Sequence, residues 1–123
     1  MHAPSITPTA SASHRRFARQ IIERRRLRAQ YFDSQFFGEH GWELLLNLFA
    51  RDDGISTIDQ AAQALQTSNS TVMVMARLLA SHGLVHQGDS DGEWGEIPLR
   101  LSENGFARIR KYLEQLQSDQ LVA

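Results

Sequence analysis

The stretch that decides the fold is residues 57–101, TIDQAAQALQTSNSTVMVMARLLASHGLVHQGDSDGEWGEIPLRL. Thr57 and Gln60 make the pattern of a capping box, in which the threonine hydroxyl accepts a backbone N–H and the glutamine side chain reaches back to the threonine. Small alanines then line one side, and small residues let a neighbouring helix approach closely. We therefore predict a short first motif helix over residues 57–66.

A second amphipathic helix is predicted over residues 68–82. Ser68 is a favourable N-cap and Gly83 a favourable C-terminal stop. Apolar residues recur at the i, i+3, i+4, i+7 spacing of one helix face. These residues are Val72, Met75, Ala76 and Leu79. Two short helices joined by a polar turn are typical of a helix-turn-helix, which presents its second helix to the major groove of DNA.

A β-hairpin is predicted after this helix, over residues 84–101, as the wing of a winged helix. Glycines interrupt its loop, and apolar residues alternate with other residues from Ile97 to Leu101, the period-two pattern of a half-buried strand. Because Pro98 has no backbone N–H to donate, we expect this strand to lie at a sheet edge or to pair on one side only.

A single domain over residues 14–123 is expected to follow a flexible tail, residues 1–13. The tail is rich in Ser, Thr, Ala and Pro and carries no charged side chain, a composition that favours disorder. Ser13 is placed to cap a helix over residues 14–32. The fold class that this sequence predicts is mainly α with a small β-hairpin.

The clearest helix in the chain is predicted over residues 42–51, after a linker over 33–41 whose Phe36 and Phe37 we expect to tuck into the core. Its apolar stripe follows the i, i+3, i+4, i+7 spacing. The stripe consists of Trp42, Leu45, Leu46 and Phe49. Leu44 and Leu48 add a second stripe, which predicts burial on more than one side.

The last predicted helix covers residues 103–117, capped by Ser102, with residues 118–123 fraying. Its apolar residues recur at 3-4-3 spacing, the seam of a helix that packs lengthwise on another helix. The seam consists of Phe106, Ile109, Leu113 and Leu116. This seam could serve the core of one chain or a dimer interface.

The net charge of −1 hides a strong asymmetry along the chain. Residues 14–28 hold seven arginines and one glutamate, whereas the remainder is acidic. A basic helix of this kind can lie on phosphate, pair with acidic residues, or simply be a solvated face. There is no apolar run long enough for a membrane span and no secretory signal, so a cytoplasmic location is expected.

Sequence patterns give no support for an enzyme, a cofactor or a metal centre. The chain has no cysteine, which excludes disulfides, zinc thiolates and thiol catalysis. It has no glycine-rich phosphate loop, no nucleophile elbow and no HExxH. His82 and His86 are separated by the helix stop at Gly83, and Asp89 to Gly92 departs from the spacing of a calcium loop.

With these elements placed, residues 41–112 resemble a winged helix of the MarR type, the multiple-antibiotic-resistance regulators. The resemblance is most specific in TIDQAAQAL, SNSTVMVMARLLASHGLV and LRLSENG. It implies transcriptional regulation by a homodimer, held by its first and last helices, that binds a near-palindromic double-stranded DNA site. It also implies tuning by a small molecule, and aromatic residues of the first 50 positions could line a pocket for an aromatic effector or form a core and its lid. Those residues are Phe17, Tyr31, Phe32, Phe36, Phe37, Trp42 and Phe49.

DNA contact is expected from the N-terminal half of the second motif helix. Its Asn and Ser side chains can hydrogen-bond bases or phosphates, and its apolar side chains can meet thymine methyls. The predicted contact residues are Ser68, Asn69, Ser70, Thr71, Met73, Val74 and Arg77. Arg15, Arg16 and Arg100 are further candidates for phosphate contacts.

Two departures from the family pattern support an alternative function. Val74 stands where the family often has a cationic residue, and Met73 where it often has a hydroxyl. The wing loop GDSDGEWGE, residues 88–96, carries four carboxylates and no base, whereas wing tips in the family usually carry an Asp-Arg-Arg run. The alternative is a winged helix that has lost DNA readout and serves as a protein-protein interaction module.

Overall fold

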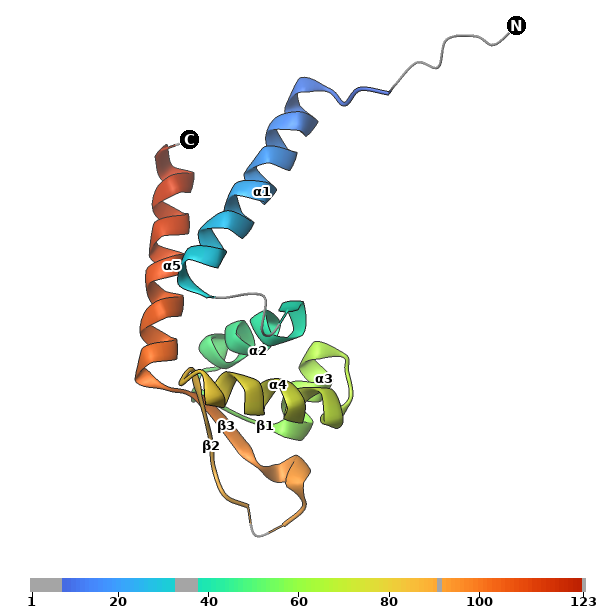
Figure 1. Cartoon of the computed structure of the whole chain (residues 1–123), viewed down its shortest axis with the longest axis vertical. Coiled ribbons are helices and arrows are strands. Elements are labelled where there is room, and N and C mark those ends of the chain that lie inside the picture. The colour runs from blue at the N-terminus through green and yellow to red at the C-terminus, as the bar shows by residue number, and fades with distance from the viewer. Residues whose placement is uncertain (1–7, 33–37, 91, 123) are drawn as a thin grey trace, which may run out of the picture.

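The structure is a computed structural model that describes residues 8–32, 38–90 and 92–122, with side chains described up to Ser118 (Figure 1). Its helices and strands follow the order expected for a winged helix. They are α1 (Ala12–Tyr31), α2 (Gly38–Ala50), β1 (Ile55–Thr57), α3 (Ile58–Leu65), α4 (Asn69–Ser81), β2 (Val85–Gln87), the 3-10 turn η1 (Trp94–Glu96), β3 (Pro98–Leu101) and α5 (Glu103–Val122). The predicted fold class is confirmed.

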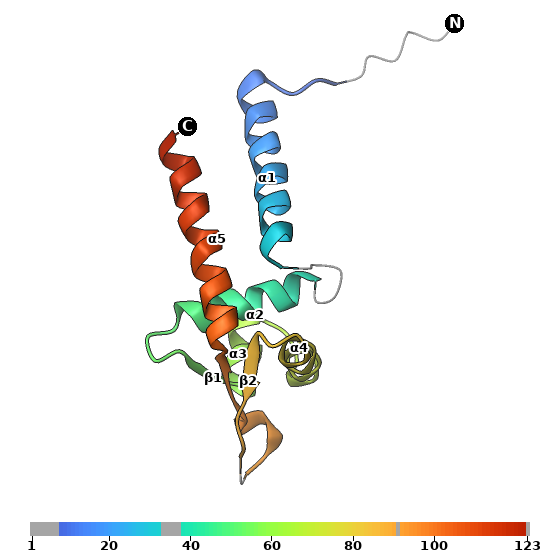
Figure 2. The ribbon, with the colours of Figure 1, turned by 60° about the vertical axis from the view of Figure 1, so that its left-hand side comes forward.

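The long terminal helices and the wing lie at opposite ends of the molecule. Figures 1 and 2 both show α1 and α5 projecting from one end and the loop between β2 and β3 projecting from the other. The helix pair α3–α4 lies between them, beside α2. Within the described ranges, no helix is both long and apolar enough to cross a membrane.

The caps that the sequence predicts at the two motif helices are present. The Thr57 hydroxyl accepts from the Gln60 N–H at 3.1 Å, and the Gln60 side chain accepts from the Thr57 N–H at 3.0 Å. The Ser68 hydroxyl accepts from the Thr71 N–H at 3.1 Å. Gly83, at φ 73°, stands in the left-handed region just after α4. These local hydrogen bonds set the helix starts independently of the rest of the fold.

The helix boundaries differ from the prediction in three places. The N-cap of α1 is Ser11, whose hydroxyl accepts from the His14 N–H at 3.2 Å, so Ser13 lies inside the helix. Helix α2 begins at Gly38 rather than 42, and Gly38 itself has a φ of 55°, in the left-handed region. Helix α5 runs to Val122 instead of ending at 117. Phe36 and Phe37 lie outside the described residues.

The prediction that the Pro98 strand lies at a sheet edge or pairs on one side only is wrong. β3 is the central strand of an antiparallel three-stranded sheet of order β1-β3-β2. Pro98 is the first residue of β3, where its missing N–H breaks no ladder, and its carbonyl accepts from the Gly88 N–H at 2.8 Å. A first-residue proline is compatible with a central strand. The small β1 therefore turns the expected hairpin into a sheet.

The core is built around α2, which is buried on more than one side as predicted. Leu44, Leu45 and Leu48 of this helix are fully buried, together with apolar residues from the motif helices, β3 and α5. The partners include Ile58, Val72, Leu79, Leu99 and Ile109. The motif helices are therefore held on a packed apolar base.

The predicted seam of α5 is only partly correct. Ile109 is fully buried and Leu113 and Leu116 are partly buried, whereas Phe106 is 46% exposed and stacks on Phe49 with ring centroids 5.0 Å apart. Tyr112, which the spacing pattern did not include, is buried instead. Its ring meets the Trp42 ring edge-on at 5.2 Å.

Substitution of Gly105 by alanine tests how closely α5 approaches the strand region. Alanine favours a helix over glycine by about 1 kcal/mol, so propensity alone predicts stabilisation. A Cβ at this position would stand 2.2 Å from the backbone carbonyl oxygen of Leu84. We expect Gly105→Ala to lower the free energy of unfolding by about 1–3 kcal/mol in urea denaturation.

The matched control is Lys111→Ala, an exposed position on the same helix, which should change the free energy of unfolding by less than about 0.5 kcal/mol. A Gly105→Ala protein as stable as the wild type would contradict the close approach of α5 to the Leu84 carbonyl.

Candidate nucleic-acid interface

Helix α4 has one face in the core and one face open to solvent. Val72, Ala76 and Leu79 are buried, which fixes the helix on the protein. Ser70, Val74 and Arg77, at i, i+4 and i+7, are exposed on the other side, and Val74 is 58% exposed. Met73 is half-buried beside them. An outward stripe of this kind is free to enter a groove or to meet a partner.

Three of the residues predicted to contact DNA make hydrogen bonds within the protein. Ser68 caps the helix, and its hydroxyl lies 3.0 Å from the hydroxyl of Thr71. The Asn69 side chain donates to the Asp59 carboxylate on α3. The Asn69 bond joins the start of α4 to α3, and the Ser68 bonds fix the first turn of α4. The structure thus separates the predicted residues into a set that positions the helix and a set that faces outward.

Asp59 also contacts the wing. A Cβ at Gly95 of η1 would stand 2.5 Å from a carboxylate oxygen of Asp59, so only glycine fits there without a shift of the carboxylate. The Asp59 carboxylate, which belongs to α3, therefore contacts both the first turn of α4 and η1. Sequence reasoning did not find this role because it joins residues far apart in the chain.

A shallow open hollow of about 460 Å³ separates α4 from η1. Its lining brings together four of the predicted contact residues and one that was not predicted. The lining residues are Ser70, Met73, Val74, Arg77 and Trp94. Trp94 is 46% exposed. The signal that could have found it is an aromatic residue in a polar, glycine-rich wing, which has no core to fill.

The wing is acidic where the structure describes it. Asp89, Glu93 and Glu96 are exposed, and Asp91 lies outside the described residues. Arg100, a predicted phosphate contact, is exposed on β3 and lines a different groove, together with Asp52 and Asp53. The pKa of Asp53 is lowered, chiefly because its carboxylate accepts from the Ile55 N–H and also because Arg51 lies nearby. Arg100 therefore does not lie on the same surface as the outward residues of α4.

The basic segment of α1 does not form one surface. Arg15 and Arg16 are exposed near the start of the helix, and an Arg15 guanidinium N–H donates to the Ala10 carbonyl. Arg28, near its end, is paired with Glu39 at 2.8 Å and lies 5.2 Å from the centre of the Trp42 ring. The Arg28 hydrogen bond lowers the pKa of the Glu39 carboxyl.

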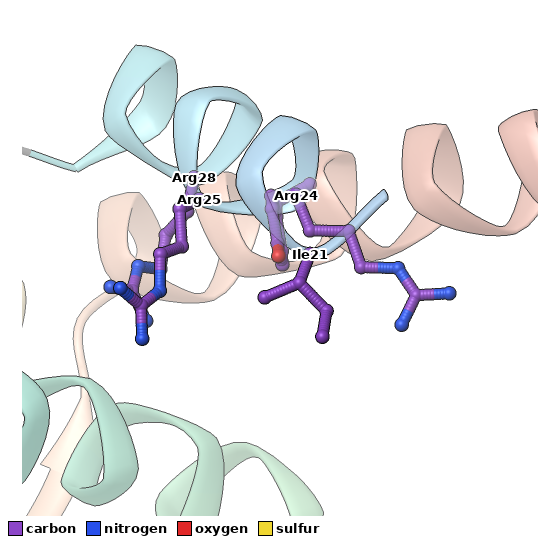
Figure 3. Close-up of a pocket in the computed structure, with 5 residues that line it drawn as sticks. Ile21, Arg24, Arg25 and Arg28 are labelled. Atoms are coloured by element: carbon purple, nitrogen blue, oxygen red, sulfur yellow. The ribbon is translucent and has the colours of Figure 1, made fainter. Parts of the chain in front are cut away.

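A small pocket of about 170 Å³ lies between α1 and α5 (Figure 3). It is lined by Ile21, Arg24, Arg25, Arg28 and Tyr112. In Figure 3 the Arg25 and Arg28 side chains run side by side, and the Arg24 guanidinium points away from them. Burial raises the pKa of the Tyr112 hydroxyl. The pocket therefore combines guanidinium groups with an aliphatic and an aromatic wall.

The described aromatic residues of the first 50 positions mostly pack on one another and on α5. Tyr31 meets Tyr112 edge-on at 6.1 Å, and the Phe32 and Trp42 rings lie 5.3 Å apart. Phe17, by contrast, is 57% exposed on α1. Among the described residues, no group of three His, Asp or Glu side chains is arranged to hold a metal ion.

Comparison with known proteins gives matches in structure but not in sequence. No family model and no curated protein matches this chain. MepR of S. aureus, solved as a MepR-DNA complex, superposes with a TM-score of 0.68 at 21% identity, covering 90% of each chain. AbsC, a MarR family transcriptional regulator from Streptomyces coelicolor, gives 0.56 at 22% identity, covering 89% of this chain and 76% of its own.

A third neighbour is NMB1585, a MarR family regulator from Neisseria meningitidis, with a TM-score of 0.56 at 18% identity over 90% of this chain and 78% of its own. The chain has the winged-helix fold of the MarR-family regulators. In this MarR-type fold α4 occupies the position of the second helix of the helix-turn-helix, and the β2–β3 loop with η1 is the wing.

Proposed function

We propose that this protein is a transcriptional regulator that binds double-stranded DNA in a sequence-specific manner, as a homodimer. The observation that carries the proposal is the outward stripe of α4, Ser70, Val74 and Arg77, mounted on a buried base beside a wing. This is the geometry with which a helix-turn-helix enters the major groove. MepR, solved with DNA, shares the fold. A regulator of genes would act in the cytoplasm, as the sequence predicts.

Binding of random-sequence duplex DNA tests the proposal without knowledge of an operator. Non-specific affinity comes from phosphate contacts and falls as salt rises. We expect fluorescence polarisation of a labelled random duplex to show binding at low salt that weakens steadily on addition of salt. Absence of binding at low salt would contradict the proposal, because the electrostatic contribution needs no particular sequence.

Substitution of Arg77 by alanine distinguishes two kinds of DNA contact. If the guanidinium reads a base, affinity for a preferred duplex should fall by about 1–3 kcal/mol while affinity for random DNA changes little. If it contacts phosphate, the salt dependence should become shallower by about one charge for every sequence. Lys111→Ala, exposed on α5, is the matched loss of one positive charge away from α4. A titration in which Arg77→Ala behaves like Lys111→Ala would remove Arg77 from the interface.

The α1 surface supports the homodimer. Phe17 and Ile21, one helical turn apart, are 57% and 40% exposed on α1, a helix described along its whole length, in which Leu27 is the one buried residue. A second chain that covers them would bury apolar area on both protomers, and each fully buried side chain contributes about 1.5–3 kcal/mol.

The expected effect of Ile21→Glu is a dimer dissociation constant raised at least about tenfold, measured by analytical ultracentrifugation. Arg19→Glu, which places the same carboxylate on the opposite side of α1, should leave the oligomeric state unchanged. Equal dimer dissociation constants for the two variants would argue that this face of α1 does not form the dimer interface.

A small aromatic effector, implied by the family resemblance, remains a prediction. Of the pockets described above, the one in Figure 3 has the chemistry that suits a small aromatic acid, because the Arg25 guanidinium favours a carboxylate and Ile21 and Tyr112 favour a ring.

The second candidate function is a protein-protein interaction module. The observation that favours it is the hollow between α4 and η1, in which Met73, Val74 and Trp94 present apolar surface beside an acidic wing. Carboxylates at the wing repel phosphate oxygens, whereas an apolar hollow with an acidic rim suits a basic protein segment. The random-duplex titration separates the two functions, since only a DNA-binding protein gains affinity at low salt.

A further inference from the structure

The polar groups available to read DNA bases are fewer than the sequence indicates. Ser68 and Thr71 bond to each other and to the first turn of α4, and Asn69 is held by Asp59. Each of these side chains already makes a bond that holds the helix start, so fewer of its donors and acceptors are available to a base. Readout by α4 is therefore left to its outward stripe and to the hollow beside that stripe.

The centre of this stripe is apolar. Val74 is 58% exposed, and its flanking positions on the stripe are Ser70 and Arg77. Met73 and Trp94 extend the apolar surface into the hollow. A valine has no hydrogen-bonding group, so it cannot distinguish bases by donors and acceptors. The apolar group that the major groove offers is the 5-methyl of thymine.

We propose that α4 recognises thymine by its methyl group, with Val74 as the contact residue and Met73 and Trp94 as the walls that exclude water around it. This inference rests on the proposed function and names its specificity. Seven residues of helix span roughly 10.5 Å, about the length of three base-pair steps. The thymine would thus lie between the nucleotide that Ser70 contacts and the nucleotide that Arg77 contacts. If Arg77 reads a base, that base is expected to be guanine.

Replacement of thymine by deoxyuridine tests this proposal, because it deletes the methyl group and leaves every hydrogen-bonding group of the base in place. The preferred duplex is first selected with the full-length protein from a random pool. Each thymine of that duplex is then replaced singly, and dissociation constants are measured by polarisation. Loss of one buried methyl corresponds to about a fourfold loss of affinity, and we expect this loss at one thymine in each half-site.

Variants of Val74 assign the contact to this side chain. In Val74→Ala, replacing the sensitive thymine by deoxyuridine should leave the dissociation constant nearly unchanged. This is the result expected when the side chain that contacts the methyl group has already been removed. Val74→Thr keeps the shape of the side chain and one methyl group, so replacing the sensitive thymine should still weaken binding in part. Lys111→Ala is the control, in which replacing the sensitive thymine should weaken binding as much as in the wild type. Because Val74 is exposed, these variants should unfold at the same temperature as the wild type.

Each outcome decides the proposal. Selected duplexes that bind equally well with every thymine replaced would overturn it and leave the regulator function intact. A sensitive thymine whose effect is unchanged in Val74→Ala would overturn the assignment to this residue. Failure to bind any duplex at low salt would overturn both the inference and the proposed function, and would favour the protein-interaction module.

Discussion

The contact between the start of α5 and the backbone at the end of α4 determines how the two halves of this molecule are joined. The Ser102 hydroxyl donates to the Gly83 carbonyl at 2.6 Å and accepts from the Gly105 N–H at 2.9 Å, while the Ser102 N–H donates to the Leu84 carbonyl at 2.9 Å. Gly105 allows this approach because it has no Cβ. The end of α4, the start of β2 and the start of α5 therefore meet at one point. This contact joins α5 directly to the end of α4, and α2, which packs on both helices, joins them a second time.

Helix α4 carries two apolar surfaces with different physical roles. Its inner surface, with Val72 and Leu79, is covered by the core and stabilises the fold. Its outer surface, with Val74 at 58% exposure, contributes less to the fold. An exposed apolar side chain at the centre of a helix that is otherwise well packed gains free energy only when something covers it. Because Met73 and Trp94 line the same hollow as Val74, the outer surface is suited to binding.

The sequence predicted those features that depend on local chemistry. The capping box at Thr57, the cap at Ser68 and the stop at Gly83 need only residues close in the chain, and they were confirmed. The terminal boundaries of α1, α2 and α5 were less accurate, because several serines could cap α1 and because glycines can be either helix breakers or helix residues. The position of β3 at the sheet centre could not be found, since it depends on pairing with β1, more than 40 residues earlier in the chain.

The candidate site was predictable by position but not by role. The periodicity of α4 places Ser70, Val74 and Arg77 outward, and the structure has them there. The bond from Asn69 to Asp59 and the approach of Trp94 are contacts between separate elements, and no spacing pattern reveals them. Asparagine is a common base-reading residue, so its capture within the protein changes what the helix can read.

The distribution of charge limits where binding energy can arise. The arginines of α1 stand on a helix that projects from the end of the molecule opposite the wing, and Arg28 is already neutralised by Glu39. The wing contributes carboxylates, and α4 contributes Arg77. Phosphate attraction at the α4 surface is therefore weak for a DNA-binding protein, and repulsion at the wing opposes it. If this surface binds DNA, a larger share of its free energy must come from contacts in the groove, apolar contact among them, and these vary with base sequence. A protein built in this way should still bind random duplex at low salt, but the salt dependence of that binding should be shallow.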